Sequence, residues 1–269
     1  MSIYHLSDDN VCTLPIGIYR DGIYHKEVII DELTGVDQHA LSDPKNRKNP
    51  QGAISNILRR VIQEIPGVLD KKSNPTHLIP ERYINEMFQA DIDALVLKCF
   101  IVSEESSRTL DFDCAACEAK LQEDLDLKEL DVYGHDPEEP PFVNIELPRG
   151  IEFDDTLYKK GRFHFITGGI QNKISKYANR GLYYTFSAVM TQCLELEDGQ
   201  KFNLEQVARM KAKDRNYVMS VVQDTIPGVD LNIEIECPEC GADSEVAVDV
   251  ANFFLPNRRK SKRSKKRSV

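Results

Sequence analysis

The chain repeats part of its own sequence, and this repetition constrains the fold more than any other feature. Residues 14–17 (LPIG) recur as 147–150 (LPRG), and at the same offset of 133 residues the segment 33–42 (LTGVDQHALS) recurs as 166–175 (ITGGIQNKIS). Further anchors follow at an offset of 123 residues, which makes five anchors in the same order. This pattern indicates an internal duplication, and its period is that of a domain rather than of a solenoid repeat.

The anchors of the second group include two cysteine pairs in CxxC spacing. The matched positions are Met87 with Met210, Asp91 with Asp214, Cys114 and Cys117 with Cys237 and Cys240, and 125–127 with 248–250. The change in offset is placed partly in a polar insertion at 43–52. We therefore expect a first repeat unit at 1–133, an acidic, proline-rich linker at 134–142, a second repeat unit at 143–257 and a disordered basic tail at 258–269.

The size and composition of the chain agree with two compact units. A length of 269 residues allows about two domains. A content of 41% hydrophobic and 29% charged residues is ordinary for a globular protein with buried cores. The sequence has no run of 18 apolar residues, as a membrane-spanning helix would require. The first ten residues lack the basic and apolar regions of a secretory signal, so we expect a cytoplasmic protein.

The net charge of −10 conceals a strong asymmetry along the chain. Residues 258–267 carry eight Lys or Arg and no acid, which leaves 26 basic against 44 acidic residues, or about −18, for the rest. An acidic body argues against a general nucleic-acid-binding protein. The tail alone could bind phosphate or an acidic partner surface.

Each repeat is expected to combine β-hairpins with helices, which makes the fold α+β. Strand-like segments at 11–19 and 27–31 flank the turn signal Arg20-Asp21-Gly22, and the segments 143–147 and 161–166 match them in the second repeat. A Thr-Gly pair then leads into a short helix in both repeats.

Apolar residues at helical spacing predict two further helices in each repeat. The first is expected at 53–65, before Pro66-Gly67, and at 181–196 in the second repeat. The longer one is expected from Pro80 to about residue 102, and from a capping box at 203–206 to about residue 223.

A β-ribbon around each cysteine pair is expected after the longer helix. Apolar and polar residues alternate on both sides of 237–241 (CPECG), and residues 110–127 form the matching ribbon. Such a knuckle points two thiolates at one ion, whereas structural zinc requires four ligands. The duplication therefore suggests one structural zinc ion, although 119 residues separate the pairs. The candidate ligands are Cys114, Cys117, Cys237 and Cys240.

Two other interpretations of the cysteine pairs stay open. A redox CxxC normally lies at the start of a helix, whose dipole lowers the thiol pKa, whereas both pairs here lie in expected hairpin turns. Alternatively, the pairs are remnants of an ancestral metal site and are simply reduced. The other cysteines, Cys12, Cys99 and Cys193, lie in apolar surroundings and are expected to be buried.

The sequence shows no catalytic motif, which predicts a protein that is not an enzyme. It has no glycine-rich phosphate loop followed by Lys-Ser/Thr, no HExxH and no GxSxG. The repeated Asp91 and Asp214 are expected to fix a loop by hydrogen bonds, since duplicated catalysis is uncommon. The polar residues expected to be solvated include His25, His39, His135, Glu32 and Asp37.

The order of the motifs resembles that of a known family. An LPxG segment is followed by TGxxQ, then by a long helix with MxxxD, then by a CxxC ribbon and a Leu-Asp-Leu or Val-Asp-Val segment. This order resembles the base-plate hub assembly proteins of T4-like contractile-tailed bacteriophages, and more loosely the tail-assembly chaperones of other tailed phages. The resemblance implies a non-enzymatic role in virion assembly, with base-plate hub or tail proteins as partners. It places the protein in the cytoplasm of the host bacterium or in the virion tail.

Two functions from different classes therefore remain. The first is an assembly or structural protein of a phage base plate or tail. The second is a zinc-stabilised adaptor that binds nucleic acid through its basic tail. The acidic body favours the first of these.

Overall fold

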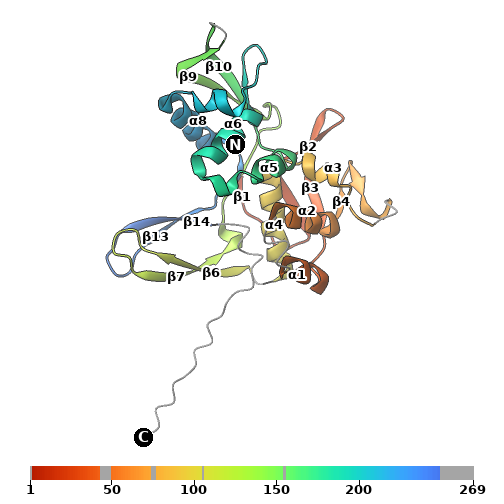
Figure 1. Cartoon of the computed structure of the whole chain (residues 1–269). Helices are drawn as coiled ribbons and strands as arrows, with labels where there is room; N and C mark the ends of the chain where they lie inside the picture. Colours follow the sequence, from red (N-terminus) through yellow and green to blue (C-terminus); the bar gives the residue numbers. More distant parts are fainter. Residues whose placement is uncertain (1, 43–49, 74–76, 105, 154–155, 249–269) are drawn as a thin grey trace.

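The computed structural model describes residues 2–42, 50–73, 77–104, 106–153 and 156–248. It confirms the α+β class, because helices and small antiparallel sheets occur in both halves of the chain (Figure 1). The tail expected at 258–269 and the residues 43–49 of the insertion lie outside the described part. None of the described helices combines the length and apolar character needed to span a bilayer.

The order of elements is similar in the two halves of the chain. The first half contains β1 (Ser2–Tyr4), β2 (Val11–Arg20), β3 (Ile23–Ile30), α1 (Gly35–Ser42), α2 (Pro50–Val61), β4 (Ile62–Ile65), β5 (Leu69–Asp70), α3 (Glu81–Glu86), α4 (Gln89–Ser103), β6 (Ser107–Asp113), β7 (Lys120–Asp126) and β8 (Val132–Gly134). The second half contains β9 (Phe142–Phe153), β10 (Thr156–His164), α5 (Gly168–Ser175), α6 (Leu182–Cys193), β11 (Leu194–Leu196), α7 (Leu204–Ala208), α8 (Ala212–Thr225), β12 (Gly228–Val229), β13 (Asn232–Glu236) and β14 (Asp243–Ala247).

The strands form small antiparallel sheets that also follow the repeat. One sheet has the order β2-β3-β4-β5, and its counterpart has the order β9-β10-β11. The ribbons β6-β7 and β13-β14 are separate two-stranded sheets. A third sheet, β1-β8-β12, joins strands from both halves of the chain, so the halves are linked by backbone pairing as well as by side chains.

The LPxG segments form matching bulges in β2 and β9, where the strand register shifts. Gly17 (φ 95°) and Gly150 (φ 80°) adopt left-handed backbone conformations. A Cβ atom would lie 2.8 Å from the carbonyl oxygen of the facing strand in both cases. Only glycine fits such a position without strain, which explains why the motif recurs with its glycine.

A buried aspartate holds each bulge in place. The Asp91 carboxylate accepts hydrogen bonds from the backbone N–H of Ile16 (2.8 Å) and of Gly17 (3.1 and 3.2 Å). The Asp214 carboxylate accepts one from the N–H of Arg149 (2.7 Å). Both aspartates are fully buried. The expectation that the repeated aspartates fix a loop is thus confirmed.

The prediction of two long, continuous helices is wrong, because each is interrupted after its first turns. The segment expected as one helix from Pro80 is divided into α3 and α4, with an extended backbone at Met87 and Phe88. The second is divided into α7 and α8, with the break at 209–211. Tertiary hydrogen bonds explain the first break: the Gln89 N–H donates to Ile166 O (2.7 Å), and the Gly168 N–H donates to Met87 O (2.8 Å).

The helices expected at 53–65 and 181–196 are shorter than predicted. They end at Val61 and Cys193, and the residues that follow form β4 and β11, which pair with β3 and β10. The apolar residues of these short strands are buried, so they matched the helical spacing although they belong to a sheet.

The buried apolar residues form two clusters. One contains residues between Leu6 and Val132, and the other contains residues between Ile145 and Val218. Val229, Leu231 and Ile233 pack against the first cluster, although they come from the second half of the chain. Cys12, Cys99 and Cys193 are buried, which confirms their expected role as small core residues.

Two polar residues expected to be solvated are buried instead. Asp37 accepts hydrogen bonds from the backbone and side chain of Thr34 and forms an ion pair with Arg60 (2.7 Å). His135 is buried in the linker, where its N–H donates to Pro15 O (2.7 Å) and its carbonyl accepts from Lys26 Nζ (2.6 Å). The start of the linker is therefore fixed against the first LPxG bulge.

Candidate metal centre

The four candidate ligands come from the two β-ribbons, which extend side by side from the rest of the molecule (Figure 1). Strands β6 and β7 are paired over seven residues each, and β13 and β14 over five. Cys114 and Cys117 lie in the turn of the first ribbon, and Cys237 and Cys240 in the turn of the second. The structure thus brings together two pairs that are separated by 119 residues in the sequence.

The two turns have the same backbone geometry. The N–H of the first cysteine donates to the carbonyl five residues later, from Cys114 to Ala119 and from Cys237 to Ala242, at 2.9 Å in both turns. The residue after the second cysteine adopts a left-handed conformation, with φ 58° at Glu118 and 69° at Gly241. The first turn therefore keeps the knuckle conformation even though it lacks the glycine that favours it.

The sulfur atoms lie close enough together to bind a single metal ion. All four Sγ atoms are within 4.8 Å of one another, and the Sγ atoms of Cys114 and Cys240, and of Cys117 and Cys237, are 3.8 Å apart. A tetrahedron with zinc–sulfur bonds of about 2.3 Å has sulfur–sulfur edges of about 3.8 Å. The first cysteine of each pair is buried and the second is exposed. Four thiols at these separations could bind one metal ion.

The electrostatics of the cluster also suit a cation. Backbone N–H groups of Cys117 and Ala116 lower the pKa of the Cys114 thiol to about 6, which favours its thiolate. The N–H of Ala242 acts in the same direction on Cys240, but the neighbouring thiols Cys117 and Cys237 raise the pKa of Cys240 to about 12. Without a cation, four adjacent sulfurs cannot all carry a negative charge. A divalent ion would remove this repulsion and bind the thiolate form of all four.

The position of the cysteines differs from that of a redox pair. Both CxxC turns connect antiparallel strands, so neither cysteine pair lies at the start of a helix, where a helix dipole would lower the thiol pKa. All seven cysteines are free thiols in the structure.

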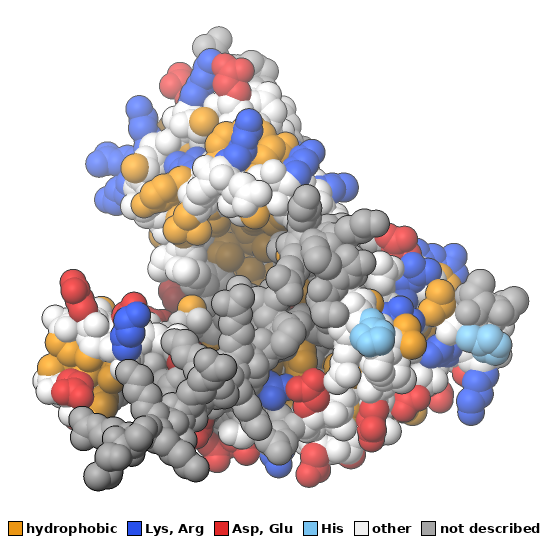
Figure 2. Space-filling view, turned by 60° about the horizontal axis from the view of Figure 1, so that its bottom comes forward, with side chains coloured by type: hydrophobic (Ala, Val, Ile, Leu, Met, Phe, Trp, Pro, Cys, Tyr) orange, Lys and Arg blue, Asp and Glu red, His pale blue; other side chains and the backbone are white. Residues whose placement is uncertain are grey.

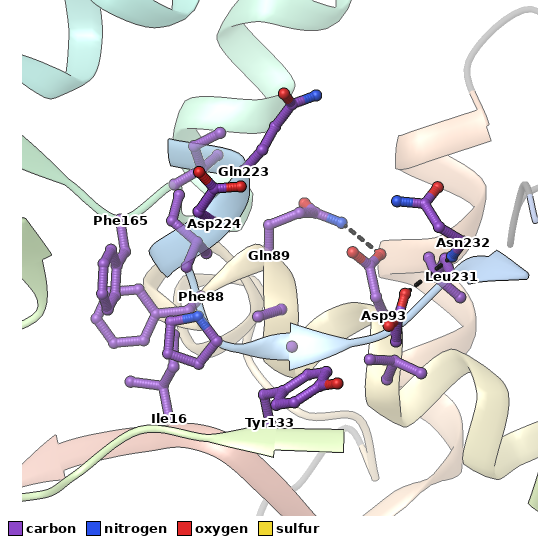
Figure 3. Close-up of a pocket in the computed structure, with 17 residues that line it drawn as sticks. Ile16, Phe88, Gln89, Asp93, Tyr133, Phe165, Gln223, Asp224, Leu231 and Asn232 are labelled. Carbon is purple, nitrogen blue, oxygen red and sulfur yellow. Dashed lines mark hydrogen bonds between the residues drawn. The ribbon is translucent and has the colours of Figure 1, made fainter. Parts of the chain in front are cut away.

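Sequence reasoning missed a cavity of about 660 Å³ between the two halves of the chain. Its walls come from β2 at Ile16, the start of α4 with the preceding Phe88, β8, the segment 165–166 and residues in 223–232 (Figure 3). Asp93, Asp224 and Asp230 line it together with Tyr133 and with amide and apolar side chains, and no Lys, Arg, His, Ser or Cys is among the described lining residues. Gln89 donates a hydrogen bond to Asp93 (2.8 Å), as Figure 3 shows.

A second missed feature is the fully buried Lys98 on α4. Its ammonium group donates to Ser7 O (2.8 Å), Ser7 Oγ (2.9 Å) and Asp9 Oδ1 (2.9 Å). These bonds attach the N-terminal segment to the helix and lower the pKa of Asp9 to about 2. A single lysine within the apolar residues of a buried helix was the signal in the sequence.

Comparison with known proteins identifies the family. The model of the family described as T4 bacteriophage base plate protein matches residues 23–255, which include both cysteine pairs and the second LPxG segment and begin after the first LPxG segment at 14–17. Neither the comparison with curated proteins nor the comparison with solved structures gives a match. The matched segment covers most of the sequence, and the chain therefore belongs to the T4 bacteriophage base plate protein family.

Proposed function

We propose that this protein is a non-enzymatic assembly or structural component of a phage base plate, and that it acts by holding a hub or tail component. The family match over residues 23–255 is the observation that carries this proposal. The elements that recur in the two halves are strand bulges held by buried aspartates, interrupted helices and cysteine turns, all of which position the backbone. Such a protein would act in the host bacterial cytoplasm, where tails are built, or remain in the virion tail.

The four cysteines are proposed to hold one structural zinc ion. The support comes from the donor set and its geometry, since four thiolates in a tetrahedral arrangement are typical of structural zinc. Because each half of the chain supplies two ligands, the ion would clamp the two ribbons together. Cys114 and Cys237, which are buried, would form the inner side of the site, and the exposed Cys117 and Cys240 would close it.

The assembly role is tested by following the protein in infected cells. A tagged copy should capture base-plate hub or tail proteins from the lysate, and mass spectrometry of purified virions should show whether it remains in the particle. Capture of nucleic acid that is released by salt, without any tail protein, would instead favour the adaptor function. A tagged protein with four cysteine-to-serine changes serves as a comparison, because it separates partner binding from the proposed metal site.

A further inference from the structure

The contact between the two halves of the chain contains a small docking interface. The start of α5 lies in the break between α3 and α4, where the N–H of Gly168 donates to Met87 O and the bridge Phe88–Thr167 continues the pairing. The fit is close, since a Cβ atom on Gly168 would lie 2.4 Å from Ile84 O. Asn172 on α5 also donates to Asn85 on α3 (3.1 Å).

The surface that receives α5 occurs a second time, at the break between α7 and α8. Met210 takes the place of Met87, and Ala212 takes the place of Gln89. In the described part of the chain, no hydrogen bond is made by the Met210 carbonyl or the Ala212 N–H. Ala208, Arg209, Lys211 and Ala212 are exposed. The second docking surface is therefore uncovered.

Exposed apolar residues extend this second surface. Leu182 and Tyr183, at the start of α6, are 70% and 67% exposed. They lie beside α8, because Arg215 donates to Tyr183 O (3.0 Å). In Figure 2, hydrophobic and basic side chains lie close together over the upper lobe, which carries α6 and α8 in Figure 1. Tyrosine and arginine beside an apolar residue are typical of the central part of a protein interface.

The element that would fit this surface also occurs a second time, at the start of α1. Thr34-Gly35 matches Thr167-Gly168, yet a Cβ atom on Gly35 would meet nothing within 4 Å. Gly35 is not among the residues with positive φ. The local structure at this position therefore does not require glycine. Docking in the manner of Gly168 would require it. The adjacent Val36 is 66% exposed.

The α1 surface and the α7–α8 surface differ from their counterparts in ways that complement each other. Val36 replaces Gly169, and Ala208 replaces Asn85, the residue that Gly169 faces, so a larger side chain meets a smaller one. The exposed acidic residues Asp31 and Glu32 precede α1, whereas the exposed basic residues Lys211 and Lys213 lie at the receiving surface. Opposite charges on the two surfaces steer and align association.

We propose that a second copy of this chain docks on the α7–α8 break through its α1 helix, in a head-to-tail arrangement that repeats the contact between α5 and the α3–α4 break. The two surfaces of such an interface are different, so each molecule keeps one surface free after pairing. Association of this kind gives a closed ring if the rotation closes, and an open filament if it does not.

Sedimentation velocity on the purified full chain tests this proposal over roughly a hundredfold range of concentration. The mass of the wild-type particle should increase with concentration and should decrease again at high salt. Gly35→Leu should remain monomeric, and so should Lys211→Glu with Lys213→Glu, with association weakened at least about tenfold in each. Glu245→Leu, which adds the same side chain at an exposed position of β14, is the control and should associate like the wild type.

Mixing the two monomeric variants gives the decisive result. Each has one intact surface, so an equimolar mixture should form a dimer that does not grow further. A wild-type chain that remains monomeric, or a mixture that contains no species larger than a monomer, overturns the proposal. Far-ultraviolet circular dichroism checks that each variant is folded. If Gly35→Leu is not folded, Val36→Lys replaces it, because a positive charge there would face the basic receiving surface.

Discussion

The carboxylate of Asp91 on α4 accepts hydrogen bonds from the backbone N–H of Gly17 at 3.1 and 3.2 Å, and this contact fixes the first LPxG bulge. Asp214 performs the same task for the second bulge through Arg149. The repeat in the sequence thus corresponds to a repeat in hydrogen bonding: a left-handed glycine in a strand and a buried aspartate on the helix behind it.

Removal of either aspartate should destabilise the protein, and Asp91 should matter more. Asp91→Ala leaves the N–H groups of Ile16 and Gly17 buried without an acceptor, which should lower the free energy of unfolding by about 2–4 kcal/mol. Asp214→Ala leaves one such group, at Arg149, and should cost about 1–3 kcal/mol. Urea denaturation measures both values, and equal or negligible losses would show that the bulges do not depend on these bonds.

Asp91 should also make stability depend on pH. Burial raises the pKa of its carboxyl to about 7, above the ordinary value of 3.8. Between these values the folded state binds the proton more tightly than the unfolded state, so this group's contribution to stability decreases as pH rises from about 4 to 7. Comparison of wild type with Asp91→Asn by urea denaturation at several pH values isolates the effect. The variant should lack this part of the slope, and an unchanged slope would contradict the assignment.

One zinc ion per chain should copurify with the protein. Cys237→Ser should abolish it and lower the stability by several kcal/mol, because binding of a structural metal is coupled to folding. Chelator treatment of the wild type should have a similar effect. Cys12→Ala and Cys193→Ala remove thiols from the apolar cores and should leave the metal content unchanged. Elemental analysis that finds no zinc in protein prepared without chelator would leave the four thiols as a reduced remnant.

Glu118 should be a site where a substitution stabilises the protein. It has φ 58°, whereas its counterpart in the second turn is Gly241. A left-handed conformation costs a side chain about 1–2 kcal/mol, so Glu118→Gly should raise the free energy of unfolding by about 0.5–1 kcal/mol after the entropy of glycine is subtracted. Gly241→Ala should lower it by about 1 kcal/mol. The pair of variants is compared in the zinc-loaded protein, and effects of the opposite sign would refute the argument.

The sequence predicts the features that depend on local pattern. The repeat predicts that Asp91 and Asp214 perform the same task, and alternating residues around Cys237 and Cys240 predict a hairpin turn. The CxxC spacing identifies two cysteine pairs, and the duplication suggests that they lie together. These inferences hold because glycine, cysteine and alternating apolar residues restrict the backbone wherever they occur.

The remaining features depend on contacts between distant residues. The apolar spacing continues through Met87 and Phe88, so the break before α4 cannot be seen in the sequence; it exists because backbone groups there bond to Ile166 and Gly168. Burial of Asp37 depends on Arg60, and burial of His135 depends on the bulge at Pro15. The cavity in Figure 3 has walls from five separate segments of the chain, which no local pattern reveals.

Deletion of the gene from the phage tests the central claim most directly, with tail assembly and infectivity as the measurement. If the protein builds or holds a base-plate component, the deletion phage should yield incomplete tails and few infectious particles, and expression of the wild-type protein from a plasmid should restore both. Complete, infectious tails at normal yield in the absence of the protein would contradict the proposed role in assembly.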